Sequence, residues 1–169
     1  MTCTDTKIIY MSEGTPLMVS SCDYDLLINH KWYPSGVMRH ASGRPEGKCV
    51  YLARYIMNPP KDMIVDHIDR NQYNNQRSNL RIGTRSQNQQ NRAKQGNNTS
   101  GYKGVYWSPP SRKWFSMIGL AGKNIYLGLF ECKHEAAMKY NQKAVELHGE
   151  FAVLNVIDSG MGDSMAECK

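Results

Sequence analysis

A carboxylate, an imidazole and two amides at fixed spacing are the candidates for chemistry in this chain. Asp66 and His67 are adjacent, Asn79 follows His67 after twelve residues, and Asn88 follows Asn79 after nine. An imidazole is mostly neutral near pH 7, so His67 can take a proton from water. Carboxylate and amide oxygens are ligands for hard divalent cations, so Asp66 and Asn88 can supply metal ligands.

Two short apolar segments flank these residues and are predicted to position them. Residues 63–65 run directly into Asp66, and residues 80–82 directly follow Asn79. We expect them to pair as strands, and alternation then directs Asp66 and His67 to opposite sides of the first strand. Upstream we expect a short lead-in over 1–15, a strand over 16–20, a helix over 23–27, strands over 32–33 and 36–40, and an apolar segment over 49–57.

The segment that carries Asn88 has the signature of a helix start. Thr84 is followed three residues later by Gln87, which is the pattern of a capping box. We expect a helix over 85–94, ended by Gly96. Residues three and four apart share one helix face, here Arg85, Asn88 and Arg92.

The positive charge is concentrated in the middle of the chain. The formal net charge is +6, and of this residues 51–95 carry eight basic and three acidic side chains. Between Asp69 and Glu131 there is no acidic residue at all, whereas basic side chains recur throughout. A long basic tract without carboxylates favours a polyanionic partner.

The segments 64–69, 79–81 and 87–91 together resemble the HNH endonuclease family, and more narrowly its phage and intron-encoded homing branch. The resemblance implies a ββα-metal fold that holds one divalent ion against double-stranded DNA. It implies that His67 is the general base for phosphodiester hydrolysis, with Asp66 and Asn88 as metal ligands. It also implies that Asn79 holds the loop and orients the base. Arg81, Arg85 and Arg92 are candidates to grip the scissile strand or stabilise the leaving oxygen, with Arg85 assigned to catalysis.

Two positions depart from the family pattern. Asn88 stands where many relatives have His, and oxygen ligands favour one Mg²⁺ or Mn²⁺ ion over Zn²⁺. Ala53 stands before Arg54, where relatives often have His, which removes that second histidine. The remaining histidines, among them His40, show no ligand spacing, so we expect structural or surface roles for them.

Residues 100–155 resemble the ethylene-response-factor (Apetala-type) DNA-binding domain. The motifs are residues 100–107, Lys113-Trp114, residues 125–130, Tyr140-Asn141 and residues 148–155. The family packs a three-stranded sheet on one helix and lays the sheet in the DNA major groove. We expect strands over 103–107, 113–120 and 124–129, and a helix over 134–147.

Strand alternation divides the faces of this second sheet. Trp114, Ser116, Ile118, Ile125 and Leu127 should face the helix. The resemblance makes the opposite face the DNA-binding one, with the candidate contacts Lys103, Tyr106, Arg112, Lys113, Phe115, Met117, Lys123, Asn124 and Tyr126. Several positions that carry arginine in plant members do not carry it here, so fewer guanine contacts and a moderate sequence preference are expected.

These inferences predict an α+β protein in which a ββα-metal (HNH) nuclease module precedes a module of three strands and a helix. We expect a nuclease domain over 1–95 with a β-rich N-terminal extension, a linker over 96–101, a DNA-binding domain over 102–157 and a flexible tail over 158–169. Five scattered cysteines, never spaced as CxxC, argue against a disulfide framework and a Cys-rich zinc site, and favour free thiols. Without a secretory signal or an apolar span, we expect a cytoplasmic protein that does not bind membranes.

The leading hypothesis is a metal-dependent DNA endonuclease of the homing type that nicks one strand, because one chain carries one such site. We expect a monomer, and a dimer is the alternative. A DNA-binding regulator with a degenerate HNH unit is the main rival function, since Asn88 and Ala53 depart from the pattern. An RNA-binding or RNA-processing protein is a weaker rival.

Overall fold

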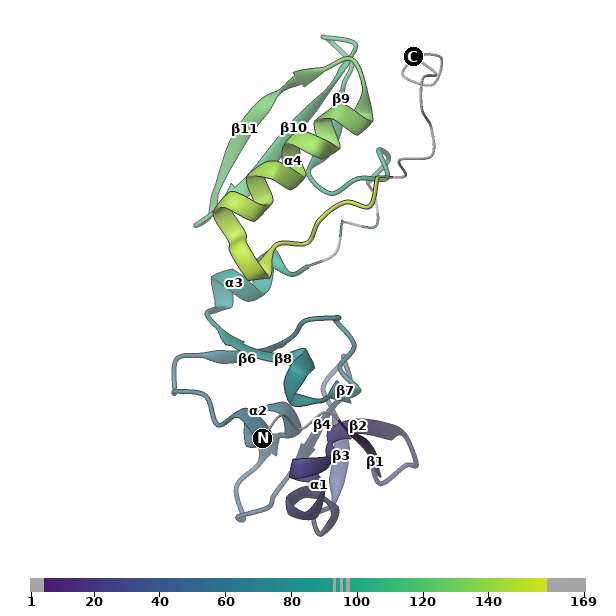
Figure 1. The fold of residues 1–169 in the computed structure, drawn as a ribbon, viewed down its shortest axis with the longest axis vertical. Coiled ribbons are helices and arrows are strands. Elements are labelled where there is room, and N and C mark those ends of the chain that lie inside the picture. The colour runs from purple at the N-terminus through teal and green to yellow at the C-terminus, as the bar shows by residue number, and fades with distance from the viewer. Residues whose placement is uncertain (1–4, 93, 95, 97, 158–169) are drawn as a thin grey trace. The chain divides into compact units, whose positions relative to one another are not determined.

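A computed structural model describes residues 5–157 except 93, 95 and 97. The chain divides into two compact units, residues 1–88 and residues 89–169 (Figure 1). Both combine helices with small sheets whose neighbouring strands are mostly antiparallel, so the α+β class is confirmed. Within the described residues no helix is long and apolar enough to cross a bilayer.

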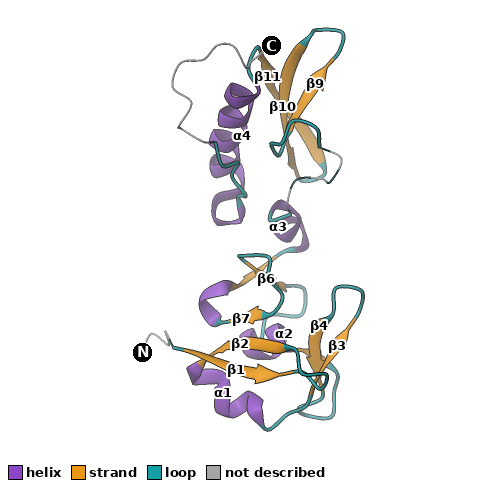
Figure 2. Ribbon diagram, turned by 90° about the vertical axis from the view of Figure 1, so that its right-hand side faces the viewer, coloured by secondary structure: helices purple, strands orange, loops and turns teal. Residues whose placement is uncertain are grey.

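The first unit is built from short elements in three small sheets. In the first sheet β2 lies between β1 and β7, in the second β4 lies between β3 and β5, and β6 pairs with β8 (Figure 2). The elements are β1 (Thr6–Tyr10), β2 (Pro16–Ser20), α1 (Ser21–Ile28), β3 (Trp32–Ser35), β4 (His40–Gly43), β5 (Val50–Tyr51), α2 (Leu52–Met57), β6 (Ile64–His67), β7 (Asn74–Asn75), the 3-10 turn η1 (Arg77–Asn79), β8 (Leu80–Gly83) and α3 (Arg85–Gln90).

One apolar cluster joins the two larger sheets of this unit to its helices. Its fully buried members include Leu17, Leu27, Trp32 and Leu52, and the Trp32 indole donates a hydrogen bond to the Leu27 carbonyl at 3.1 Å. The expectation of a lead-in without structure over residues 1–15 is wrong for 6–10. Those residues form β1 because they pair along the whole of β2, and Ile9 thereby enters the core.

The β3–β4 hairpin begins its second strand later than expected. Residues 36–39 form the turn, and β4 starts at His40, so the expected strand over 36–40 is wrong. One face of the hairpin, with Trp32, Ala41 and Gly43, points into the core. A side chain on Gly43 would lie within 2.9 Å of the Trp32 ring, so this position requires glycine. The other face, which includes His40, points outward.

The expected pair of strands around the DH dipeptide is confirmed. β6 pairs antiparallel with β8, with Asp66 opposite Arg81 and His67 opposite Leu80. The loop between them is anchored by Arg77, whose guanidinium donates to the buried Asp23 carboxylate at 2.7–3.1 Å. Because Asp23 lies on α1, this ion pair fixes the loop to the body of the unit.

The second unit is one antiparallel sheet covered on one face by a long helix (Figure 1). The strand order is β11-β10-β9, as expected for three consecutive strands. The elements are β9 (Val105–Ser108), β10 (Lys113–Leu120), β11 (Lys123–Phe130), α4 (Lys133–His148) and the 3-10 turn η2 (Gly149–Phe151).

Small side chains let α4 approach this sheet closely. Ala136, Ala137 and Ala144 are fully buried against sheet residues such as Val105 and Ile118. Gly104 has φ +75°, and a Cβ there would lie 2.2 Å from the Tyr140 ring, so the close approach requires glycine at this position. The predicted helix-facing side chains of β10 and β11 all point to α4, which confirms the division of the faces.

The segment after α4 closes the second unit through amide pairs. The Asn155 side chain accepts from the Lys103 backbone N–H at 2.6 Å and donates to its carbonyl at 3.1 Å. The Asn141 side chain makes the same pair of bonds to the Asn155 backbone, at 2.7 and 2.8 Å.

The cysteines follow the expectation only in part. Cys22 and Cys49 are exposed and are not disulfide-bonded, as expected from their scattered positions. Cys132 is disulfide-bonded, so the expectation of a free thiol is wrong there. Sequence spacing could not find this bond, because a disulfide depends on which cysteines the fold brings together. The expected tail over 158–169 lies outside the described residues.

Candidate active site

The imidazole of His67 is held by a buried amide. His67 Nε2 lies 3.2 Å from Asn75 Oδ1, and Asn75 is 2% exposed. The Asn75 amide nitrogen donates to the Gln72 carbonyl at 3.1 Å, so its oxygen is the acceptor for the ring. In the neutral form of the His67 ring this contact assigns the proton to Nε2 and the lone pair to Nδ1, which is the arrangement that a base requires.

Asn79 ties together the loop that follows His67. Its side chain accepts from the Asp69 backbone N–H at 3.0 Å and donates to the Asp69 carboxylate and the Asn74 carbonyl, each at 2.8 Å. Burial alone would raise the pKa of Asp69, but hydrogen bonds from the Asn71 backbone and from the Asn74 and Asn79 side chains hold it below its usual value. This geometry supports a loop-holding role for Asn79, and the assignment to catalysis stays a prediction.

Asp66 points to the opposite side of β6 from His67 and is nearly buried. Arg81 donates to its Oδ2 from Nε at 3.0 Å and from Nη2 at 2.7 Å. The two side chains are 7% and 9% exposed, so the guanidinium neutralises a buried carboxylate. Arg81, which the sequence suggested as a DNA contact, thus forms an ion pair with Asp66 inside the unit. Its contact with DNA stays a prediction.

Helix α3 begins as the capping box predicts. The Thr84 backbone N–H donates to the Gln87 side chain at 2.8 Å, and the Gln87 N–H donates to the Thr84 hydroxyl at 3.2 Å. This start puts Asn88 one turn into the helix, where it is half-buried. The expected extent to residue 94 is wrong, because α3 ends at Gln90. Arg92 therefore does not continue the helix face of Arg85 and Asn88.

The predicted ligand set fits a hard divalent cation in its chemistry. Asp66 offers carboxylate oxygen and Asn88 offers amide oxygen, from a strand and a helix that are joined through β8. Among the described residues no three His, Cys, Asp or Glu side chains gather as a metal site. The predicted site has only one such side chain, the Asp66 carboxylate, together with the Asn88 amide. Water and phosphate oxygens commonly complete the coordination shell of Mg²⁺.

A second imidazole lies beside the first. The rings of His40 and His67 are close to parallel, at 27°, with centroids 6.3 Å apart, and the Tyr51 ring meets His40 edge-on at 5.9 Å. His40 comes from the start of β4. Burial lowers the pKa of His40, and the neighbouring His67 lowers it further. The spacing of the histidines in the sequence did not predict this contact, and the structural or surface role expected of His40 stays a prediction.

In the second unit, the sheet face opposite α4 carries stacked aromatic rings. Phe115 lies between Tyr106 and Tyr126, with ring centroids 5.4 Å and 6.5 Å away. Met117 lies opposite Tyr126 in the strand register, so it shares this face. Tyr126 is 58% exposed. Because aromatic faces contact bases and sugars without a fixed hydrogen-bond pattern, such a face suits contact with nucleic acid.

The basic candidates around this sheet differ in what they bind. The Lys103 ammonium donates hydrogen bonds to the carbonyls of Gln90 and Arg92 at 2.6 and 2.7 Å. These bonds hold the segment that precedes the sheet. Lys113 forms a salt bridge with Glu131 at 2.7 Å, and both side chains are substantially exposed. Arg112 is exposed in the turn before β10, and Lys123 and Asn124 are exposed at the start of β11. The DNA contacts of all these residues stay predictions.

Comparison with known proteins decides the family. The sequence profile described as HNH endonuclease matches residues 57–90, which is the stretch from the end of α2 through β6, β8 and α3. An uncharacterised HNH endonuclease of Acanthamoeba polyphaga mimivirus is 35% identical over 156 residues, covering 86% of this chain and 78% of that protein. The chain belongs to the HNH endonuclease family. This HNH protein is therefore a nuclease.

Two further relatives each match one part of the HNH protein. Protein 3.8 of Escherichia phage T7 is 34% identical over 93 residues, which is 55% of this chain and 76% of that protein. An AP2-like ethylene-responsive transcription factor of Arabidopsis thaliana is 37% identical over 59 residues, 35% of this chain but only 12% of the plant protein. No solved structure matches the chain significantly.

Two residues of the HNH site escape prediction from sequence alone. Asn75 lies in a stretch where 14 of 28 residues between 71 and 98 are Asn or Gln, so nothing distinguishes it from its neighbours. His40 lies 27 residues before His67 and reaches it only through the packing of two separate sheets. The only signal in the sequence was Ala53, which stands where relatives often have a histidine. Its absence could have prompted a search for a second imidazole from another element.

Proposed function

We propose that this HNH nuclease is a metal-dependent DNA endonuclease of the homing type whose catalytic base is His67. The observation that carries this proposal is the β6–β8 pair with its following helix. It holds the His67 ring by a buried amide and presents the oxygen donors Asp66 and Asn88 from the same small unit. This arrangement supports the roles that the family resemblance implies for these three residues.

In the proposed reaction His67 takes a proton from a water molecule at Nδ1. The water oxygen forms a bond to the phosphorus of a DNA phosphodiester, and one P–O bond to the leaving sugar oxygen breaks. The Asn75 oxygen accepts the hydrogen bond from Nε2 and so stabilises the charged ring that results. Arg85, exposed at the start of α3, can donate to the developing charge on the phosphate.

A Mg²⁺ or Mn²⁺ ion bound by Asp66 and Asn88 would neutralise phosphate charge and stabilise the leaving oxygen. Arg81 gives the apo protein a way to keep Asp66 charged while it is buried. An amide binds cations weakly, so metal affinity should depend on the phosphate oxygens of bound DNA. The His40 ring, beside His67, limits where the base can turn.

We also propose that the second unit places the nuclease on its target. Its three strands, single helix and exposed aromatic face have the architecture implied by the plant DNA-binding family, and the partial match to a plant transcription factor supports this. On this proposal residues 1–95 cut, residues 96–101 link and residues 102–157 bind DNA. With one active site per chain, a monomer nicks one strand per encounter.

The test is incubation of supercoiled plasmid with the full chain and Mg²⁺ or Mn²⁺. The proposal predicts conversion to the open circle that is lost on addition of a chelator and falls at least about 100-fold in His67→Ala, which is a usual cost of losing a general base. His134→Ala is the matched control, because His134 lies in the second unit, and should cut like the parent. Equal cutting by both variants would refute the assigned base.

The rival function is a DNA-binding regulator, and the Asp66–Arg81 pair is the observation that favours it. A carboxylate neutralised by a buried guanidinium is a poorer cation ligand. That rival predicts that the parent binds duplex DNA but leaves plasmid intact at every metal concentration. The same plasmid experiment therefore separates the two functions.

A further inference from the structure

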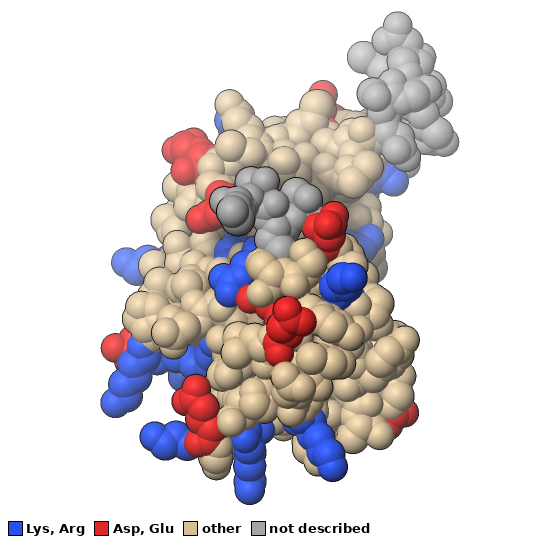
Figure 3. Space-filling model, turned by 60° about the horizontal axis from the view of Figure 1, so that its bottom comes forward, with Lys and Arg blue, Asp and Glu red and all other residues tan. Residues whose placement is uncertain are grey.

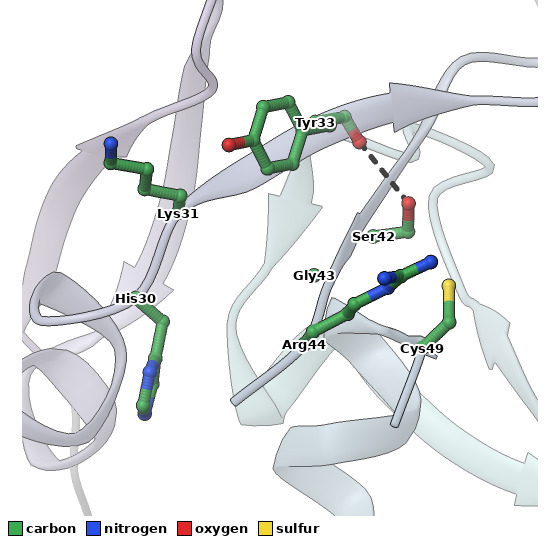
Figure 4. A pocket seen from close by; sticks show the side chains of 7 residues that line it. All are labelled: His30, Lys31, Tyr33, Ser42, Gly43, Arg44 and Cys49. Carbon is green, nitrogen blue, oxygen red and sulfur yellow. Dashed lines mark hydrogen bonds between the residues drawn. The ribbon is translucent and has the colours of Figure 1, made fainter. Parts of the chain in front are cut away.

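A cavity of about 520 Å³ opens at the far end of the β3–β4 hairpin in the first unit. Two cationic side chains, Lys31 and Arg44, line it with His30, and the lining contains no carboxylate (Figure 4). Lys31 and Arg44 are exposed, and within the part of the chain that the structure describes neither forms an ion pair. Two uncommitted cations at one cavity favour an anionic ligand.

The wall of the cavity also carries polar groups. The Ser42 hydroxyl donates to the Tyr33 carbonyl at 3.4 Å, and Figure 4 shows both side chains at the cavity with Arg44 below them. Figure 3 shows basic and acidic side chains interspersed over the surface in view, so charge alone does not mark out a binding face. What distinguishes the cavity is that its lining contains two cationic side chains and no carboxylate.

The cavity lies on the same sheet face as the active site. Side chains alternate along β4, so His40 and Ser42 project from one face, and Arg44 continues that series. The register places Tyr33 and Tyr51 opposite Ser42, on that same face. The His40 ring in turn lies beside His67. One outward face therefore leads from the catalytic imidazole to the basic cavity.

The basic cavity is close enough to the His67 ring for one bound duplex to reach both. Four residues separate His40 from Arg44, and an extended strand rises about 3.3 Å per residue, which gives about 13 Å. Because the His40 ring lies beside His67, a duplex whose scissile phosphate lies at His67 can present a nearby backbone phosphate at Arg44.

We propose that this cavity binds a backbone phosphate of the substrate DNA near the cut, with Lys31 and Arg44 as its cationic ligands. This inference rests on the proposed function, because it takes DNA as the substrate and His67 as the position of the cut. The cavity would fix the register of the duplex on the nuclease unit, independently of the second unit.

The test compares two double variants that remove the same charge. Lys31→Ala/Arg44→Ala changes the cavity, whereas Lys7→Ala/Lys61→Ala removes two exposed lysines of the same unit outside it. Affinity for a fluorescent duplex is measured by anisotropy at several salt concentrations, with EDTA to prevent cutting. Each lost phosphate contact lowers the slope of log K against log[salt] by about 0.9.

The cavity variant should lose about one unit of slope and bind at least about tenfold more weakly at low salt, while the control keeps the slope of the parent. Both should keep the parental circular dichroism spectrum. Equal slopes in the two variants would overturn the proposal. Binding of inorganic phosphate to the parent without any change in the DNA slope would also overturn it, and would assign the cavity to a free anion.

A second measurement alters the DNA and needs no variant. Neutral methylphosphonate groups replace single phosphates of a cleaved duplex, one position at a time. The proposal predicts weaker binding to the parent when one backbone position near the cut is neutral, and no such loss for the cavity variant. A parent that neither binds nor cuts DNA would instead be a failure of the proposed function.

Discussion

At the scale of single residues, the His67 ring, which we propose as the base, is held by a group outside its own strand. Asn75 accepts the Nε2 proton of His67, and its own amide is fixed on the Gln72 carbonyl. On the other side of β6, Arg81 neutralises Asp66. The two members of the DH dipeptide thus have separate partners, so substitutions of those partners should separate orientation of the base from support of the metal ligand.

Asn75→Ala should slow single-turnover cleavage about tenfold without changing DNA affinity. The ring of His67 then loses the acceptor that fixes its tautomer, while every proposed DNA contact remains. Asn75→Asp keeps an acceptor oxygen at the same place and should recover part of the rate. An unchanged rate in Asn75→Ala would show that this hydrogen bond does not orient the base.

Arg81→Ala should lower the free energy of unfolding by about 3 kcal/mol, because it leaves the Asp66 carboxylate buried without its partner. The measurement is urea denaturation followed by Trp32 fluorescence, since Trp32 lies in the core of that unit. Asp66→Asn/Arg81→Ala removes the unpaired charge and should be more stable than Arg81→Ala alone. The reverse order would contradict the assignment of the pair as a mutual neutralisation.

At the scale of elements, close approach of helix and sheet sets the geometry of the second unit. The alanines of α4 and the glycine before β9 make room for the Tyr140 ring, which is 3% exposed. Burial of that ring raises the pKa of Tyr140 to about 12. The sheet face opposite α4 is therefore shaped by the packing beneath it.

Gly104→Ala should lower the free energy of unfolding of the second unit by about 3 kcal/mol. The added methyl would overlap the Tyr140 ring at 2.2 Å, and φ at this position is +75°. Gly101→Ala is the matched control, with φ +82° but nothing within 4 Å of the added carbon. It should lose only the backbone cost of about 1 kcal/mol. Equal losses in thermal denaturation would mean that the contact with Tyr140 does not limit the fold.

The elements of this chain are largely predictable wherever the signal is local. The capping residues Thr84 and Gln87 predict the start of α3. The alternation of side chains along residues 113–120 predicts which of them face α4. β1 was not predictable, because its five residues become a strand only by pairing with β2. His40 and Asn75 were missed for the same reason, since their contacts with His67 depend on how separate sheets pack.

At the scale of the whole molecule, the chain forms two compact units, and we propose that they divide cutting from placement. The first holds the HNH residues, and the second presents an aromatic sheet face. The net charge of +6 lets the entire chain approach a polyanion, but it does not choose a sequence. On this account, cutting and placement should respond to different substitutions.

Tyr126→Ala should weaken binding to the cleaved duplex about tenfold and leave the cleavage rate at saturating DNA unchanged. Tyr126 is 58% exposed at the edge of the aromatic stack, so its loss removes contact area without opening a cavity. Val145→Ala, at a side chain 56% exposed on α4, is the control for a change of similar exposure off this face. Anisotropy titrations in EDTA give both affinities. If the two variants bind equally well, the sheet face is not the DNA surface.

The most direct test of the active-site account is the Mn²⁺ dependence of the single-turnover cleavage rate in four proteins. Asp66→Asn and Asn88→Ala should need at least about tenfold more Mn²⁺ for half-maximal rate than the parent, because the first replaces a carboxylate with a weakly binding amide and the second removes an oxygen ligand. His67→Ala should keep the parental half-saturation but reach a plateau about 100-fold lower. Parental Mn²⁺ dependence in both ligand variants, or a parental plateau in His67→Ala, would contradict the account.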